Sequence, residues 1–168
     1  MAASGKFFIA YDNKADSIAA VGGGNWNANL PVSNVLDYRV MKKARTSNAV
    51  ATSSVIKLSL GNIYQIEAVA VLHTNLSPGA KVQVKLFANP DFTGLIYDGG
   101  LNDVYPAGCM PEAAIPFGAP NKGTARPSME QLRQFQGNAF HKLTVPQQGR
   151  YIEISISDAA NPDGFIEV

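Results

Sequence analysis

In the stretch Arg150-Tyr151-Ile152-Glu153-Ile154-Ser155-Ile156-Ser157, isoleucines alternate with polar side chains from Ile152 to Ser157. Such a period of two places the apolar groups on one face of a half-buried β-strand. The same alternation recurs at residues 54–60 and 81–87, and a longer apolar run at 66–76 indicates a strand buried on both faces. Turns rich in Gly, Pro, Asn and Asp bound these runs, so the sequence predicts an antiparallel β-sandwich. Its expected core includes Leu58, Val69, Val71, Val84 and Ile154.

Shorter segments refine this fold. Pro31-Val32-Ser33-Asn34-Val35 precedes Ala44-Arg45-Thr46, and Phe165-Ile166-Glu167-Val168 closes the chain. Their order resembles the galactose-binding-like β-sandwich of discoidin domains and many carbohydrate-binding modules. It is similar in particular to variants of that sandwich in structural proteins of tailed bacteriophages. The resemblance covers residues 26–168 and implies an all-β, antiparallel jelly-roll sandwich, a fold that hosts binding, assembly and enzyme-accessory roles.

Length and composition suit one folded unit. The 168 residues predict a single β-sandwich domain over 1–168. Charged residues make up 16% of the chain, below the usual quarter, which favours a surface partly covered by a partner. Abundant Ser, Thr, Asn and Gln offer another way to solvate a monomer. A net charge of +1 without a basic stripe argues against nucleic-acid binding.

The cellular compartment follows from the cysteine count and the N-terminus. Cys109 is the single cysteine, so no disulfide forms within the chain, as expected for assembly in a reducing cytoplasm. The apolar run at 7–10 is too short for a signal peptide or a membrane span, so membrane insertion is not expected.

An irregular insertion over residues 98–137 interrupts the strand pattern with five prolines. A short helix is predicted near 128–135, because Ser128 can cap it with Gln131 as its capping-box partner. The insertion is either a loop that covers one end of the sandwich or an arm that docks a neighbouring subunit. Under the docking interpretation, the candidate interface residues are Tyr105, Met110, Ile115, Phe117 and Phe165.

Catalytic chemistry finds no pattern in the sequence. His73 and His141 are the two histidines, without neighbouring cysteines, so no metal site is predicted. Paired carboxylates, a nucleophile elbow and a phosphate-binding loop are all missing from the sequence. The expectation is a protein with no catalytic residues and no cofactor.

Sugar binding has candidate residues. Trp26 and Tyr38 can stack on a sugar ring, while Asn27 and Arg39 can bond its hydroxyl groups. The alternative is structural, with Trp26 covering the core and Arg39 bracing its loop.

Two functions follow. The leading hypothesis is a non-enzymatic virion structural protein, a subunit of a bacteriophage tail tip or baseplate that is assembled in the host cytoplasm. Its partners would be other tail proteins, in a homo-oligomer or a multi-subunit assembly. The alternative is a carbohydrate-binding module that recognises a host surface glycan.

The end of the chain carries one more expectation. In the phage proteins that the sequence resembles, a further strand follows the segment at 165–168 and closes the sandwich, and here that strand is missing. An open sheet edge is therefore expected. We expect either that a neighbouring subunit donates the missing strand or that the chain is a fragment of a longer protein. Both are preferred to a third possibility, in which residues 7–11 fill the gap. Fast hydrogen exchange is expected at Ile166 and Val168 of the isolated chain.

Overall fold

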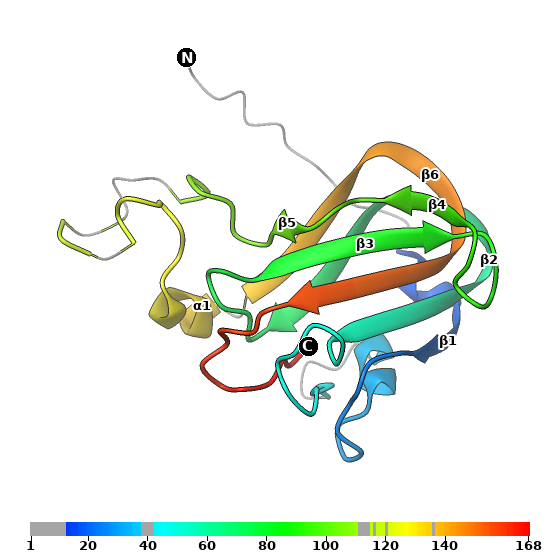
Figure 1. Cartoon of the computed structure of the whole chain (residues 1–168), viewed down its shortest axis with the longest axis horizontal. Coiled ribbons are helices and arrows are strands. Elements are labelled where there is room, and N and C mark those ends of the chain that lie inside the picture. The colour runs from blue at the N-terminus through cyan, green and yellow to red at the C-terminus, as the bar shows by residue number, and fades with distance from the viewer. Residues whose placement is uncertain (1–12, 38–41, 111–114, 116, 120, 136) are drawn as a thin grey trace.

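Two long strands organise the protein (Figure 1). The computed structural model describes residues 13–37, 42–110, 115, 117–119, 121–135 and 137–168. The strand order in the sheet is β1-β2-β6-β3-β4, with β5 also paired to β3 and the pairings antiparallel. The strands are β1 (Ile18–Gly22), β2 (Val55–Thr74), β3 (Lys81–Phe87), β4 (Leu95–Asp98), β5 (Asn102–Asp103) and β6 (Gly137–Ser157). The helices are α1 (Met129–Phe135) and two 3-10 turns, η1 (Lys14–Ser17) and η2 (Val32–Leu36).

A bend in β2 and β6 turns one sheet into a sandwich. The first part of β2 pairs with the end of β6, from Val55 opposite Ser155, and the second part pairs with the beginning of β6, as far as Thr74 opposite Gly137. The register breaks between Ser59 and Tyr64, where the two strands curl over together (Figure 1). Gly149 lies opposite Tyr64 in this bend. Glycine weakens a regular strand and is typical of such tight corners.

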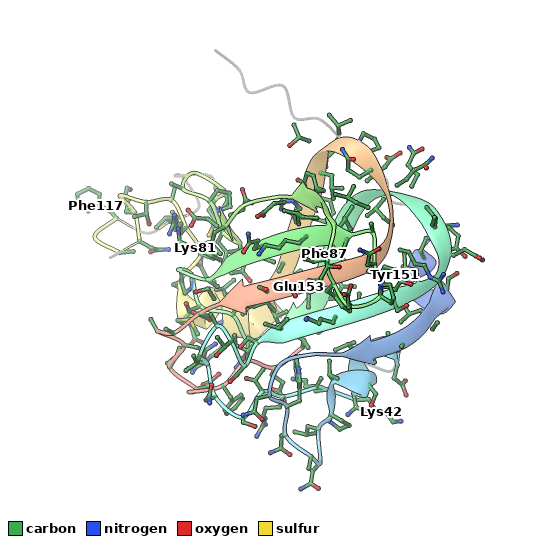
Figure 2. The ribbon with its side chains drawn as sticks, turned by 45° about the vertical axis from the view of Figure 1, so that its right-hand side comes forward. Lys42, Lys81, Phe87, Phe117, Tyr151 and Glu153 are labelled. Atoms are coloured by element: carbon green, nitrogen blue, oxygen red, sulfur yellow. The ribbon has the colours of Figure 1, made fainter. Side chains whose placement is uncertain are left out.

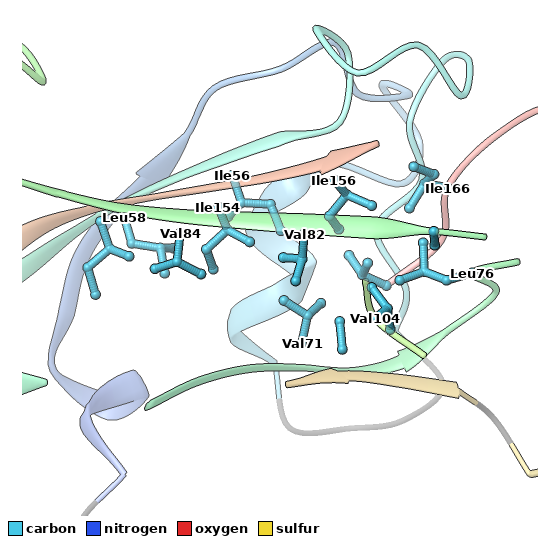
Figure 3. Packing of buried hydrophobic residues seen from close by; sticks show 14 of the residues in the cluster. Ile56, Leu58, Val71, Leu76, Val82, Val84, Val104, Ile154, Ile156 and Ile166 are labelled. Atoms are coloured by element: carbon cyan, nitrogen blue, oxygen red, sulfur yellow. The ribbon is translucent and has the colours of Figure 1, made fainter. Parts of the chain in front are cut away.

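The core lies between the two layers formed in this way. Figure 3 shows Val71, from the second part of β2, facing the buried residues of the other layer. The alternation predicted for residues 81–87 and 150–157 is confirmed, because the inward residues are at most 5% exposed. These residues are Val82, Val84, Leu86, Ile152, Ile154 and Ile156. Of the expected core residues, Leu58, Val71, Val84 and Ile154 are buried, and Val69 is partly buried.

One strand prediction was wrong in this second layer, and one strand was missed. The run at 66–76 is not buried on both faces, since Leu72 is 55% exposed and Ala70 is exposed too. The strand at the beginning of β6 was missed, although Ala139, His141 and Leu143 point inward there. A small residue and a histidine give little hydrophobic signal, which is why the alternation was not evident in the sequence.

Residues 166–168 pair with the segment at 44–46. Val168 exchanges two backbone hydrogen bonds with Ala44, at 2.8 and 2.9 Å, and the Thr46 amide donates to the Ile166 carbonyl at 2.8 Å. Ile166 is 0% and Val168 8% exposed. The expectation of an unfilled edge at these residues was therefore wrong. The segment at 44–46 was regarded as a family signature, and its role as the partner of residues 166–168 was missed.

Within the insertion, α1 begins with reciprocal capping contacts. The Gln131 amide donates to Ser128 Oγ at 3.3 Å, and the Ser128 amide donates to Gln131 Oε1 at 2.8 Å. The insertion extends away from the end of the sandwich where β6 begins and ends (Figure 1). Cys109 is exposed on it. None of the helices in the described ranges is long and apolar enough to cross a membrane.

His141 is a titratable group inside the core. It is 8% exposed, and its Nε2 lies 3.1 Å from the Tyr97 hydroxyl. Burial lowers the pKa of His141 below its usual 6.5, because a buried imidazole is harder to charge. At low pH the unfolded chain therefore binds a proton more readily than the folded chain does. The contribution of His141 to stability is fully present above the pKa that this residue has in the unfolded chain. It is lost as the pH falls from there toward the lower pKa that His141 has in the folded chain.

The layered core gives a first prediction. Val71→Asp should prevent folding, because an unpaired buried charge costs several kcal/mol against a total stability of about 5–15 kcal/mol. The neighbouring side chain of Leu72 points outward, so Leu72→Asp should change the free energy of unfolding by less than about 1 kcal/mol. Thermal melting followed by circular dichroism checks both, and a cooperatively melting Val71→Asp protein would contradict this strand placement.

The closing segment gives a second prediction. The amides of Ile166 and Val168 should exchange slowly in the isolated chain, because both are hydrogen-bonded to the segment at 44–46. Hydrogen–deuterium exchange read by NMR measures this directly. Exchange as fast as at exposed loop amides would show that the segment does not pair in solution.

The buried histidine gives a third prediction. Between about pH 7.5 and about pH 5, His141→Gln should lose less unfolding free energy than the unaltered protein, since glutamine does not titrate. Urea denaturation at several pH values provides the two curves. If they fall in parallel, His141 does not set the acid limb of stability.

Candidate functional site

Of the sugar-site residues predicted from the sequence, the structure describes Trp26 and Asn27. Trp26 is half-buried against the core, and its Nε1 donates to the Val55 carbonyl at 3.3 Å. This geometry gives Trp26 a structural role. Asn27 is exposed and accepts a hydrogen bond from the Asn29 amide at 2.9 Å, which shapes its own turn. Tyr38 and Arg39 lie outside the described residues.

The predicted interface residues are also dispersed. Phe117 is 97% exposed, with Lys122 Nζ 5.2 Å from its ring centre. Ile115 is 2% exposed, so its assignment as a docking residue was wrong. Tyr105 packs against the core and Met110 is half-buried. Phe165 lies outside the insertion, and the centre of its ring is 4.1 Å from the Arg45 guanidinium carbon.

A groove lies on the outer face of the sheet that contains β3 and the end of β6. It has a volume of about 410 Å³, within the range of roughly 300–1,000 Å³ that is common for small-molecule sites. One wall is the edge strand β1 and the other is the turn between β3 and β4. The residues that line it are Ala20, Val21, Gly22, Gly23, Lys57, Ser59, Pro90, Phe92 and Tyr151.

Aromatic rings form one wall of this groove. Phe92 meets Phe87 edge-on with 5.8 Å between ring centres, and meets Tyr151 in the same way at 6.0 Å. Figure 2 shows Phe87, Tyr151 and Glu153 on the outward face of the strands. Phe87 and Tyr151 lie opposite each other in the register of β3 and β6. Sequence reasoning missed the groove because Phe92 comes next to Phe87 and Tyr151 only in the folded structure.

Lys57 supplies the charge among the residues that line the groove. Its Nζ lies 4.6 Å from the centre of the Phe92 ring, a favourable cation–π distance, and 3.5 Å from Glu153 Oε2. Glu153 stands in register between Lys57 on β2 and Lys85 on β3. Lys57 therefore presents donor N–H groups beside an aromatic surface, in a region where neighbouring carboxylate and ammonium charges largely balance.

Phe92 itself has an unusual backbone. Its φ is 61°, in the left-handed region that a bulky residue rarely adopts and that costs about 1–2 kcal/mol. Hydrogen bonds hold the turn in place, with Asn89 Nδ2 donating to Thr93 Oγ1 at 3.0 Å and the Thr93 hydroxyl donating to Asp91 Oδ1 at 2.7 Å. This bond from Thr93 lowers the pKa of Asp91 below its usual value, so the carboxylate stays charged.

A second hollow, of about 320 Å³, lies between the insertion and Pro78. The charged residue in its lining is Arg126, whose NH2 is already paired with Asp103 Oδ2 at 2.6 Å. Its lining holds no aromatic ring, so it offers less to a ligand than the outer groove. In the ranges that the structure covers, no three His, Cys, Asp or Glu side chains gather closely enough to hold a metal ion.

Several solved structures that are similar to this chain are carbohydrate-binding modules. The family 32 module of NanJ from C. perfringens, in complex with galactose, is 13% identical with a TM-score of 0.54, and the alignment covers 92% of this chain and 95% of that one. The family 32 module of AlyQ, in complex with 4,5-unsaturated mannuronic acid, is 16% identical with a TM-score of 0.52 and 89% of each chain covered. A pectin-binding module is 13% identical with a TM-score of 0.51, covering 89% of this chain and 85% of that one.

These identities are low, so the likeness concerns the fold. No family model matches the chain, and no curated protein matches it in sequence. None of the similar structures links it to phage tail proteins. The chain has the antiparallel, galactose-binding-like β-sandwich fold of family 32 carbohydrate-binding modules.

Proposed function

We propose that this protein is a carbohydrate-binding module without catalytic activity of its own. The observation that carries the proposal is the outer groove, in which aromatic rings and hydrogen-bonding groups meet on a fold shared with sugar-binding modules. The alternative hypothesis from the sequence thereby becomes the preferred one. A tail-subunit role and oligomerisation stay predictions from the sequence resemblance, without support from the similar structures.

The chemistry of the groove suits a sugar ring. A pyranose has an apolar face of C–H groups and a rim of hydroxyl groups. The half-buried Phe92 ring matches the apolar face, backed by Tyr151, which is only 9% exposed. The Lys57 ammonium and the Ser59 hydroxyl match the rim. Small-molecule sites commonly combine an apolar, aromatic lining with a few such polar groups, which fix the orientation of the ligand.

The similar structures hold both neutral and acidic sugars, namely galactose in one and an unsaturated mannuronic acid in another. Lys57 can donate to a hydroxyl or to a carboxylate. The charges of Lys57 and Glu153 nearly balance, so they favour neither neutral nor acidic sugars. Both classes of sugar therefore belong in the first binding test.

Isothermal titration calorimetry against galactose, unsaturated mannuronic acid and pectin tests the proposal. Saturable binding of at least one of the three is expected. Lys57→Met keeps the apolar stem and removes the ammonium group, and it should weaken that binding about tenfold, because hydrogen bonds to charged groups contribute about 1.5–3 kcal/mol. No binding of any of the three by a correctly folded protein would count against the proposed function.

A further inference from the structure

The chain contains the same turn sequence twice, with different endings. Asn89-Pro90-Asp91 is followed by Phe92, and Asn161-Pro162-Asp163 is followed by Gly164. In each turn the fourth residue donates its amide to the carbonyl of the first, at 3.0 Å for Phe92 and 3.1 Å for Gly164. The φ angles of the fourth residues are 61° and 74°. The two turns therefore adopt the same left-handed conformation at the same position.

Glycine is the residue that this position favours. It adopts a positive φ without a steric penalty, whereas the Cβ of a larger residue is crowded by the backbone. Gly164 meets this requirement in the second turn. Phe92 does not, so the first turn carries a bulky side chain at a position where the backbone would be more stable without one. Strained residues of this kind cluster at ligand-binding sites when the surrounding structure holds them in place.

The Phe92 side chain is directed by this strained backbone toward the groove. The Lys57 ammonium lies 4.6 Å from the centre of its ring, and the rings of Phe87 and Tyr151 meet it at steep angles of 70° and 66°. Phe92 is half-buried, so part of the ring still faces solvent in the groove that it lines.

The opposite wall has the complementary property. Gly22, the last residue of the edge strand β1, and Gly23, which follows it, line the groove. At Gly23 the Lys57 side chain fills the space next to the backbone, since an added Cβ would lie 3.0 Å from Lys57 Cγ. At Gly22 an added Cβ would meet no atom within 4 Å, so the missing side chain leaves open space next to the backbone. Phe92 is thus a large residue at a position where the backbone favours glycine, and Gly22 is a small residue at a position where a larger side chain would fit.

We infer that Phe92 is the stacking platform of a pyranose-binding site in the outer groove, with the ring of the sugar held between Phe92 and the open space beside Gly22. Lys57 donates to a hydroxyl or carboxylate oxygen at the rim of the sugar. This assignment rests on the proposed carbohydrate binding and places it on the sheet face, away from Trp26. A purely structural role for Phe92, as a cover for Tyr151, is the alternative that the experiment must separate.

NMR titration of the unaltered protein locates the site without any substitution. Galactose and pectin oligosaccharides are the probes. The amides of Gly22, Lys57 and Phe92 should shift most in a saturable manner. Shifts that centre on Trp26 or on the insertion would overturn the groove assignment while carbohydrate binding itself holds. If neither probe shifts any amide, the proposed function fails at these probes, and the groove assignment fails with it.

Two substitutions of Phe92 then separate binding from stability. Phe92→Gly and Phe92→Asn both remove the ring and both suit a positive φ. Each variant should melt within about 4 °C of the unaltered protein, because relief of the backbone offsets the lost ring contacts. Each should bind the probe about tenfold more weakly or not at all. Unaltered binding, or a much larger fall in melting temperature in both variants, would overturn the assignment.

A matched pair of variants completes the test. Gly22→Leu fills the opposite wall and should weaken binding at least about tenfold with the fold intact, since the side chain enters open space. Phe117→Gly removes a 97% exposed ring at the far end of the molecule (Figure 2) and should bind the probe as the unaltered protein does. Normal binding by Gly22→Leu, or a loss with Phe117→Gly equal to that with Phe92→Gly, would contradict a site between Phe92 and Gly22.

Discussion

The pairing of β2 with β6 on both sides of a bend is the constraint on which the rest of the structure depends. Because the same two strands contribute to both layers, the distance between the layers and the direction of the core side chains are set together. Each fully buried aliphatic side chain in the resulting core contributes about 1.5–3 kcal/mol. β3 and β1 then add to the free edges of β6 and β2, and this addition builds both walls of the outer groove.

The sequence predicted those parts of the fold in which local alternation decides the outcome. Ile152, Ile154 and Ile156 are inward because a strand repeats every two residues, whatever its neighbours are. The bend could not be predicted in the same way, since a change of layer leaves each strand locally extended. The pairing of Ile166 with Thr46 was missed for a related reason. Three residues carry too little pattern to reveal a partner that lies 120 positions away.

The candidate site shows where sequence reasoning stops and what it overlooked. Trp26 stood out because tryptophan is a common sugar-stacking residue, yet its indole donates inward to the Val55 carbonyl. Phe92 was not among the candidate residues. The internal comparison with Gly164 was available in the sequence, because one chain contains both turns and only one ends in glycine. What the sequence could not provide is the neighbourhood of Phe92, which draws on β1, β2 and β6.

The bent pair of strands also has a consequence for the order in which the protein can fold. Val55 pairs with Ser155, and the segment at 44–46 pairs with the last residues of the chain. Contacts between residues so far apart require large loops to close, and proteins dominated by them fold in milliseconds to seconds. During synthesis β2 must wait for β6, so the apolar residues of β2 stay exposed until β6 has been made. A newly made chain therefore passes through a period in which aggregation competes with folding, and assistance by chaperones should have its largest effect there.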